Sequence, residues 1–164
     1  MKTLTPQQVL LLTIIQSGPK EGLTRYDIMI KFNQIISPVD HPYSPGALYP
    51  AINKLKTMNL IDSNHDTFKV TNSGEREIEA ALLREPLPDS IFGIVTLVLA
   101  IGLSPHLQIK TEALKRIEIN LIKNNHISSS GDSTISDKFY PTNIVVPFLV
   151  GAIQKVIIEM RANK

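Results

Sequence analysis

The chain has 164 residues, 43% of them hydrophobic and 20% charged, which suits one moderate globular domain or a small domain with an appendage. It contains no cysteine, so disulfides and thiolate metal sites are excluded, and this is compatible with a reducing cytoplasm. The formal net charge is only +2, so any binding to nucleic acid must come from the local placement of Lys and Arg.

No membrane or secretion signal is evident in the sequence. The longest apolar run, residues 91–103, is too short to span a bilayer. The first residues, 1–12, lack the basic start and the small-residue cleavage site of a signal peptide. We therefore expect a cytoplasmic protein without a membrane partner.

The N-terminal residues predict a helix that is buried on more than one side. Thr5, Pro6 and Gln8 form the pattern of a capping box with proline at the first helical position. Residues 9–15 are apolar on nearly every face, and Gly18 ends the helix. Something beyond its own small domain should therefore cover such a helix.

A second helix follows and leads into a proline-rich connector. Thr24 is the predicted N-cap, and Ile28, Phe32 and Ile35 form the predicted core stripe. Residues 37–43 contain the turn signals of a connector between helices.

The third helix, predicted from Ser44 to about residue 57, is amphipathic in an unusual way. Ser44 is the predicted N-cap and Pro45 fits the first position. One face carries the apolar stripe Leu48, Ala51, Ile52 and Leu55. The opposite face carries small, polar and cationic groups, namely Gly46, Tyr49, Pro50, Asn53, Lys54 and Thr57. A short helix of this kind suits a DNA major groove.

A hairpin and a fourth helix complete the N-terminal pattern. Residues 61–62 and 68–70 predict two short strands around a turn at 63–66, and Thr71 caps a helix that runs to about residue 84. Asn59 precedes the hairpin as a left-handed helix cap. The order helix, helix, amphipathic helix, hairpin, helix predicts a winged helix-turn-helix domain, mainly α with a small β-hairpin wing.

Residues 44–61, SPGALYPAINKLKTMNLI, resemble the recognition helix of the PadR-type winged helix-turn-helix transcriptional regulators. That family's pattern is Ser-x-Gly-x-Leu-Tyr-Pro, then apolar residues, then Gly-Leu-Ile. The matching residues are Ser44, Gly46, Leu48, Tyr49, Pro50, Ile52, Leu55, Leu60 and Ile61. Asn59 stands where the family usually has glycine, and the left-handed conformation tolerates both. Phe68-x-Val70-Thr71-x-x-Gly74 similarly resembles the family's junction between wing and helix.

The remaining residues predict a helical region that dimerises. Residues 85–89 read as a linker, 90–103 as an apolar helix, and 104–105 as the start of a helix with an apolar stripe at Leu107, Leu114, Ile117 and Leu121. Residues 126–143 read as a loop and 144–161 as a last apolar helix. This apolar surface favours a symmetric homodimer formed through the C-terminal helices and the helix at 5–17. The order also resembles the C-terminal dimerisation region of many PadR-type proteins. We therefore predict a winged helix DNA-binding domain at 1–84, a linker at 85–89 and a helical dimerisation region at 90–164.

The resemblance implies a homodimeric, sequence-specific DNA-binding repressor whose partner is a double-stranded DNA operator. Asn53 is expected to contact adenine N6 and N7, and Lys54 a guanine edge or a phosphate. Phosphate contacts are expected from Tyr49 and Ser44, and flanking ones from Arg25, Tyr26 and Lys56. The full candidate DNA-binding set is Arg25, Tyr26, Ser44, Gly46, Tyr49, Pro50, Asn53, Lys54, Lys56 and Lys69.

Two alternatives stay open at this point. Residues 1–84 contain 9 Lys and Arg against 8 Asp and Glu, which is little positive charge for a DNA-binding head and favours a module that binds a partner protein. The resemblance also leaves room for a small hydrophobic effector near the dimer interface, although the C-terminal aromatic residues equally suit a packed dimer core. These are Phe92, Phe139, Tyr140 and Phe148.

Enzymatic chemistry finds no support in the motifs. The four histidines show no paired spacing for a metal, and no nucleotide-binding loop or nucleophile elbow is present. We expect no catalytic residues, no metal and no cofactor.

Overall fold

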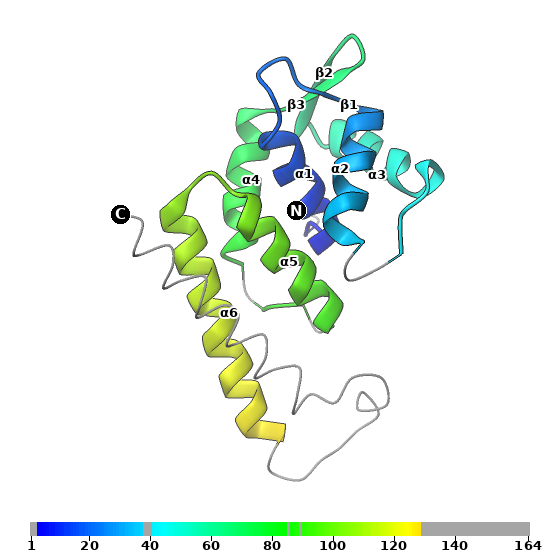
Figure 1. The fold of residues 1–164 in the computed structure, drawn as a ribbon. Helices are drawn as coiled ribbons and strands as arrows, with labels where there is room; N and C mark the ends of the chain where they lie inside the picture. Colours follow the sequence, from blue (N-terminus) through cyan, green and yellow to red (C-terminus); the bar gives the residue numbers. More distant parts are fainter. Residues whose placement is uncertain (1–2, 38–40, 85, 89, 129–164) are drawn as a thin grey trace. The chain divides into compact units, whose positions relative to one another are not determined.

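The computed structural model describes residues 3–37, 41–84, 86–88 and 90–128, with side chains up to Leu121. The chain divides into two compact units, residues 1–109 and 110–164. Along the chain the elements are α1 (Pro6–Gln16), β1 (Leu23–Thr24), α2 (Arg25–Ile36), α3 (Pro45–Thr57), β2 (Ile61–Asn64), β3 (Thr67–Val70), α4 (Asn72–Leu82), α5 (Ile91–Leu103) and α6 (Leu107–Ser128) (Figure 1).

Side-chain capping starts the first two helices as their sequences predict. The Thr5 hydroxyl accepts from the Gln8 backbone N–H at 3.3 Å, while the Gln8 amide oxygen accepts from the Thr5 N–H at 3.0 Å. Thr24 and Asp27 form the same reciprocal arrangement at the start of α2. Each capping box satisfies N–H groups that have no partner within the helix, so local sequence alone sets where α1 and α2 begin.

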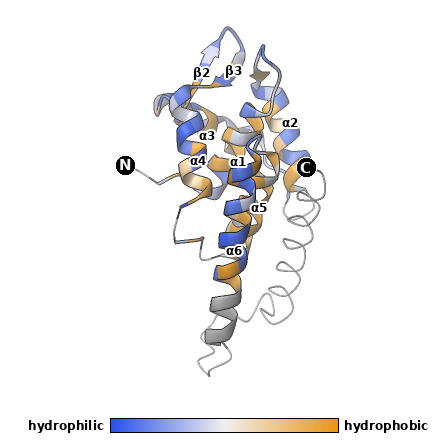
Figure 2. Cartoon of the chain, turned by 90° about the vertical axis from the view of Figure 1, so that its left-hand side faces the viewer, coloured by the Kyte–Doolittle hydropathy of each residue, from blue (hydrophilic) through white to orange (hydrophobic). Residues whose placement is uncertain are grey.

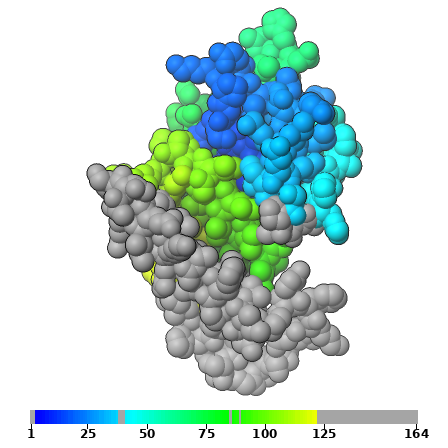
Figure 3. Space-filling model, in the orientation of Figure 1, coloured from blue at the N-terminus to red at the C-terminus, as the bar shows by residue number. Residues whose placement is uncertain are grey.

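The sheet contains a strand that the sequence did not reveal. β1 pairs antiparallel with β3, which pairs antiparallel with β2, so the described sheet has the order β1-β3-β2. β1 is only two residues long, and Leu23 lies opposite Phe68 in its register. The hairpin is also longer than predicted, because β2 continues to Asn64 and β3 begins at Thr67. Its tip projects from the first unit (Figure 3).

Helix α1 lies at the centre of the first unit. All residues from Gln8 to Ile15 are buried, and the helix packs against α5 most extensively and also against α2, α4 and β3. Hydrophobic residues are concentrated in the interior of this helical cluster (Figure 2). The cover predicted for α1 therefore comes from α5 of the same chain. The part expected of the helix at 5–17 in a dimer interface stays a prediction, with its residues Gln8 to Ile15 already buried within one chain.

The core stripes differ from the predicted ones in detail. In α2, Ile28, Phe32 and Ile36 are buried, whereas Ile35 is only half-buried. Helix α6 begins at Leu107 rather than at residues 104–105, and it continues to Ser128, into the segment predicted as a loop. Ala113, Leu114, Ile117 and Leu121 are buried, while Leu107 is exposed. The helix predicted at 144–161, with Phe139, Tyr140 and Phe148, lies outside the described residues.

The observed elements confirm the predicted fold class. The order of helices and hairpin in the first unit is that of a winged helix domain, mainly α with a small antiparallel sheet. The compact units divide after Ile109, whereas the sequence suggested a functional boundary at 85–89, and that boundary stays a prediction.

A tight junction joins the end of α3 to the hairpin and to α4. Asn59 adopts the left-handed conformation expected of it, with φ 57°. Its carbonyl accepts from the Thr71 hydroxyl at 2.8 Å, and the next carbonyl, that of Leu60, accepts from the Thr71 N–H at 3.0 Å. A Cβ at Gly74 would overlap this same Leu60 oxygen. Glycine at this position therefore allows α4 to approach the hairpin, which fixes α3 relative to the wing.

We expect Gly74→Ala to lower the free energy of unfolding by about 2 kcal/mol or more, because the added methyl meets backbone that cannot rotate away. Urea denaturation of the purified variant measures this change. Gly102→Ala is the matched control, since a Cβ there meets nothing within 4 Å. Equal stability of the two variants would contradict the role assigned to Gly74.

Candidate nucleic-acid interface

Helix α3 presents the face that its sequence predicts. Leu48, Ile52 and Leu55 are buried, and Ala51 is half-buried beside them. The opposite side is exposed to solvent, apart from Tyr49, which is half-buried; its exposed residues are Gly46, Pro50, Asn53, Lys54, Lys56 and Thr57. The α-helix continues through Pro50 without a break. Its outer surface is therefore available for contact with another molecule.

The start of α3 differs from an ordinary capped helix. Ser44 occupies the N-cap position with extended backbone, but its hydroxyl makes no capping hydrogen bond, so the capping role predicted for this side chain is wrong. A Cβ on the exposed Gly46 would have only the Ser44 hydroxyl near it among the described residues, at 3.7 Å. A helical glycine costs roughly 1 kcal/mol relative to alanine. Packing within the described chain gives no reason for this cost, whereas close approach of a partner would.

Arg25 connects α2 to the outer face of α3. Its Nη2 donates to Asn53 Oδ1 at 2.9 Å. Its guanidinium carbon lies 5.8 Å from the centre of the Tyr49 ring and 5.6 Å from that of Phe68. Both separations are within the range of cation–π attraction, so two aromatic rings from different elements hold the guanidinium in place.

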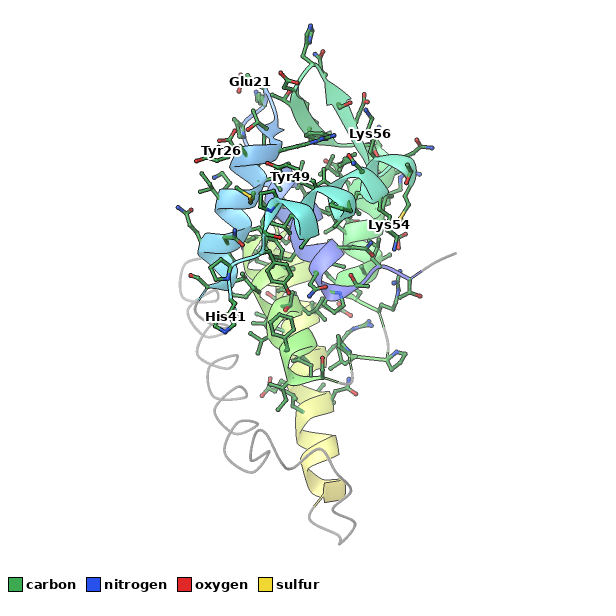
Figure 4. All side chains as sticks on the ribbon, turned by 90° about the vertical axis from the view of Figure 1, so that its right-hand side faces the viewer. Glu21, Tyr26, His41, Tyr49, Lys54 and Lys56 are labelled. Carbon is green, nitrogen blue, oxygen red and sulfur yellow. The ribbon has the colours of Figure 1, made fainter. Side chains whose placement is uncertain are left out.

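These contacts border a hollow of about 400 Å³ between α2, α3 and the hairpin. It is lined by Thr24, Arg25, Tyr26, Tyr49, Lys56, Ser63, His65, Asp66 and Phe68. Lys56 Nζ donates to Ser63 Oγ at 2.6 Å, which ties the end of α3 to β2. Tyr26, Tyr49 and Lys56 can be followed in Figure 4. The hollow thus brings together four of the predicted residues, Arg25, Tyr26, Tyr49 and Lys56. Asn53 is joined to them by its hydrogen bond with Arg25.

Other predicted residues lie elsewhere. Lys54 and Pro50 line a separate hollow of about 290 Å³ on the other flank of α3, facing α1 and α2. Lys54 and Lys56 are about 200° apart around the helix, since each residue turns it by about 100°. Lys69 lies on β3 opposite Asp62 and does not line either hollow. The two flanks of α3 therefore carry one lysine each, with Asn53 between them.

Charge is distributed unevenly over the first unit. Helix α3 carries Lys54 and Lys56 and no acidic residue, whereas α4 carries the acidic residues Glu75, Glu77 and Glu79 against one arginine. The two helices lie on different sides of α1 (Figure 1). The near-zero net charge thus conceals a cationic α3 and an anionic α4.

One carboxylate near the hollow has a distinct electrostatic state. The hydroxyl of Thr24, followed by its backbone N–H, donates to Asp27, and these hydrogen bonds hold the pKa of the Asp27 carboxyl below its usual value. Asp27 therefore stays ionised at neutral pH, and its negative charge interacts favourably with the positive N-terminal end of the α2 dipole.

Sequence reasoning missed several residues of the hollow. The sequence places Phe68 only in the second hairpin strand and in the junction motif, whereas the structure buries its side chain to 4% exposure. The contact of its ring with Arg25 depends on the pairing of β1 with β3, which no local sequence pattern predicts. Asp66 and His65 form the hairpin tip, where His65 has φ 54°.

Known proteins similar to this chain are found among solved structures. No protein-family model and no curated protein matches the sequence. PadR from Bacillus subtilis is similar with a TM-score of 0.43 and 17% identity, over 98% of this chain and 96% of that chain. The structure of Bacillus subtilis PadR in complex with p-coumaric acid is similar with a TM-score of 0.46 and 15% identity, over 96% of this chain and 95% of that chain. The structure of the same protein in complex with operator DNA is similar with a TM-score of 0.42 and 16% identity, over 94% of this chain and 96% of that chain. These are likenesses of fold at low sequence identity.

Within the described ranges, no group of three or more His, Asp and Glu side chains is placed to hold a metal ion. None of the helices described is both long and apolar enough to cross a membrane.

We expect Gly46→Ala to weaken DNA binding about tenfold while leaving the fold intact, because the methyl projects into the space a close partner would occupy. Fluorescence anisotropy with a selected DNA site measures the affinity. Gly102→Ala, in α5, controls for the general effect of replacing a helical glycine. Unchanged affinity of Gly46→Ala would remove this position from the interface.

Proposed function

We propose that this chain is a sequence-specific DNA-binding transcriptional regulator that acts as a homodimeric repressor. The observation that carries the proposal is the exposed outer face of α3, which continues into a hollow containing Arg25, Tyr49 and Lys56. The resemblance of residues 44–61 to a recognition helix supports the same function.

In this proposal α3 enters the major groove and the hairpin approaches the adjacent backbone. Tyr49 and Ser44 donate to phosphates, and Lys54 and Lys56 do so from the two flanks of the helix. With 13 residues, α3 is about 20 Å long, which is enough to follow the groove over several base pairs. Repression follows from occlusion of a promoter.

The C-terminal helical region is proposed to join two chains. Two heads related by two-fold symmetry would read half-sites about 34 Å apart on a palindromic operator. Release by a small hydrophobic molecule, through a change in the spacing of the heads, belongs to the same proposal and rests on the resemblance alone.

A protein-interaction module is the second candidate. The hairpin carries Asp62 and Asp66 against Lys69, and its tip is a two-residue turn, so it offers little attraction to phosphates. A partner protein with a basic surface would tolerate this wing better than DNA would.

Selection of binding sites from genomic DNA should yield a palindromic consensus with half-sites about one helical turn apart. The affinity for the best site should fall steeply as the salt concentration rises. Because Lys54 is proposed to contact a phosphate, Lys54→Ala should reduce the slope of log affinity against log salt concentration by about one in magnitude. Lys31→Ala is the control, because Lys31 is an exposed lysine on α2 that lines neither hollow. Failure to enrich any sequence would favour the protein-interaction module.

Sedimentation equilibrium of the full chain at micromolar concentration should give twice the chain mass of 18.2 kDa. The expectation follows from the resemblance of the C-terminal helices to the dimerisation region of PadR-type proteins. A folded monomer at these concentrations would contradict the homodimer.

A further inference from the structure

The strongest constraint on how this surface reads DNA is the contact between Arg25 and Asn53. Arg25 is the first residue of α2, and Asn53 lies in the exposed middle of α3. Their hydrogen bond is 2.9 Å long, and the Tyr49 and Phe68 rings hold the guanidinium. Asn53 therefore does not meet DNA as an isolated side chain.

The positive charge of Arg25 is not neutralised by a carboxylate in the described part of the chain. The ion pairs found there join other residues, in α4 and around α6. Arginine keeps its charge at all relevant pH values, and its guanidinium carries five N–H donors in a fixed plane. One of these donors is used on Asn53, so others remain for an external acceptor.

The contact also fixes which way the Asn53 amide faces. A guanidinium only donates, so the amide atom that meets it must be the oxygen, and the amide NH2 group is turned elsewhere. Asparagine recognises adenine by accepting from N6 with this oxygen while donating to N7. Arg25 takes one of the two lone pairs of this oxygen, so the adenine contact expected from the sequence would have to use the second lone pair, beside the guanidinium donors.

We propose that Arg25 and Asn53 form one reading unit that selects guanine over adenine at the base pair it contacts. The inference rests on the proposed DNA-binding function. The free groups of the pair are mostly donors, namely the Asn53 NH2 and the remaining Arg25 N–H groups, against a single lone pair left on the Asn53 oxygen. In the major groove, guanine offers two adjacent acceptors, N7 and O6, whereas adenine offers N7 beside a donor. Donors facing the adenine amino group would be left unpaired, which is the physical basis of the selection.

The test is binding-site selection with the full-length chain and with Arg25→Met. Methionine keeps an unbranched apolar stem against the two rings but removes every donor of the residue 25 side chain, so both lone pairs of the Asn53 oxygen become free. The wild-type chain should prefer guanine at one position of each half-site by about tenfold, and Arg25→Met should shift that position towards adenine. Competition between two duplexes that differ only at this base pair gives the ratio directly.

Two further variants separate reading from folding and from charge. Asn53→Asp, at an exposed site, keeps the acceptor for Arg25 but removes the NH2 donors, so the guanine preference should fall even if Arg25→Met is unstable. Lys31→Met removes one positive charge from the same helix as Arg25, and it should leave the base preference unchanged.

The outcomes distinguish this inference from the function on which it rests. A selected consensus with adenine at the contacted position, or a guanine preference that both Arg25→Met and Asn53→Asp retain, overturns the reading unit and leaves DNA binding in place. Selection of no sequence by the wild-type chain overturns both. A preference that moves with Arg25→Met and Asn53→Asp but not with Lys31→Met establishes the pair as the determinant.

Discussion

The burial of α1 is the constraint on which the rest of the first unit depends. The helix has almost no polar face, and its residues from Gln8 to Ile15 are all buried. Each fully buried Leu or Ile side chain contributes roughly 1.5–3 kcal/mol of hydrophobic stabilisation, so several elements must pack around this one helix for the fold to exist. They are α5, α2, α4 and β3. Because these elements supply the core, α3 needs only three fully buried side chains to dock.

That small docking stripe is what makes a recognition surface available. With Leu48, Ile52 and Leu55 in the core, most of the α3 surface is left exposed. Its position is nevertheless fixed at both ends. Tyr43, just before the helix, packs edge-on against the buried Phe32 with ring centres 5.3 Å apart, and its hydroxyl accepts from Gln7 at 2.8 Å. At the other end, the junction around Leu60 and Gly74 joins the helix to the wing and to α4. A helix held in this way can present side chains at defined positions without large reorganisation on binding.

The comparison between sequence and structure separates local from long-range physics. Helix starts at Thr5, Thr24 and Thr71, the buried stripe of α3 and the left-handed Asn59 all depend on neighbours in sequence, and each is confirmed. The strand β1 and the contact of Arg25 with Asn53 depend on how distant segments meet, and neither leaves a periodic pattern. The packing that covers α1 is predictable in part. Its need for a cover follows from composition, but the choice between α5 and a second chain depends on the tertiary arrangement.

The low net charge of the N-terminal residues is a weaker argument against DNA binding than the sequence suggests. Exposed charges separated by more than a Debye length, about 10 Å at 0.1 M salt, are largely screened from one another. A phosphate beside Arg25, Lys54 and Lys56 therefore responds mainly to the charges within about that distance, and much less to the net charge of the whole N-terminal region. The groups unfavourable to a phosphate are those of the hairpin, because Asp66 lines the same hollow as Arg25. The balance between electrostatic attraction along α3 and repulsion at the hairpin thus decides between DNA and a protein partner. Charges of both signs lie around the same hollow of the first unit.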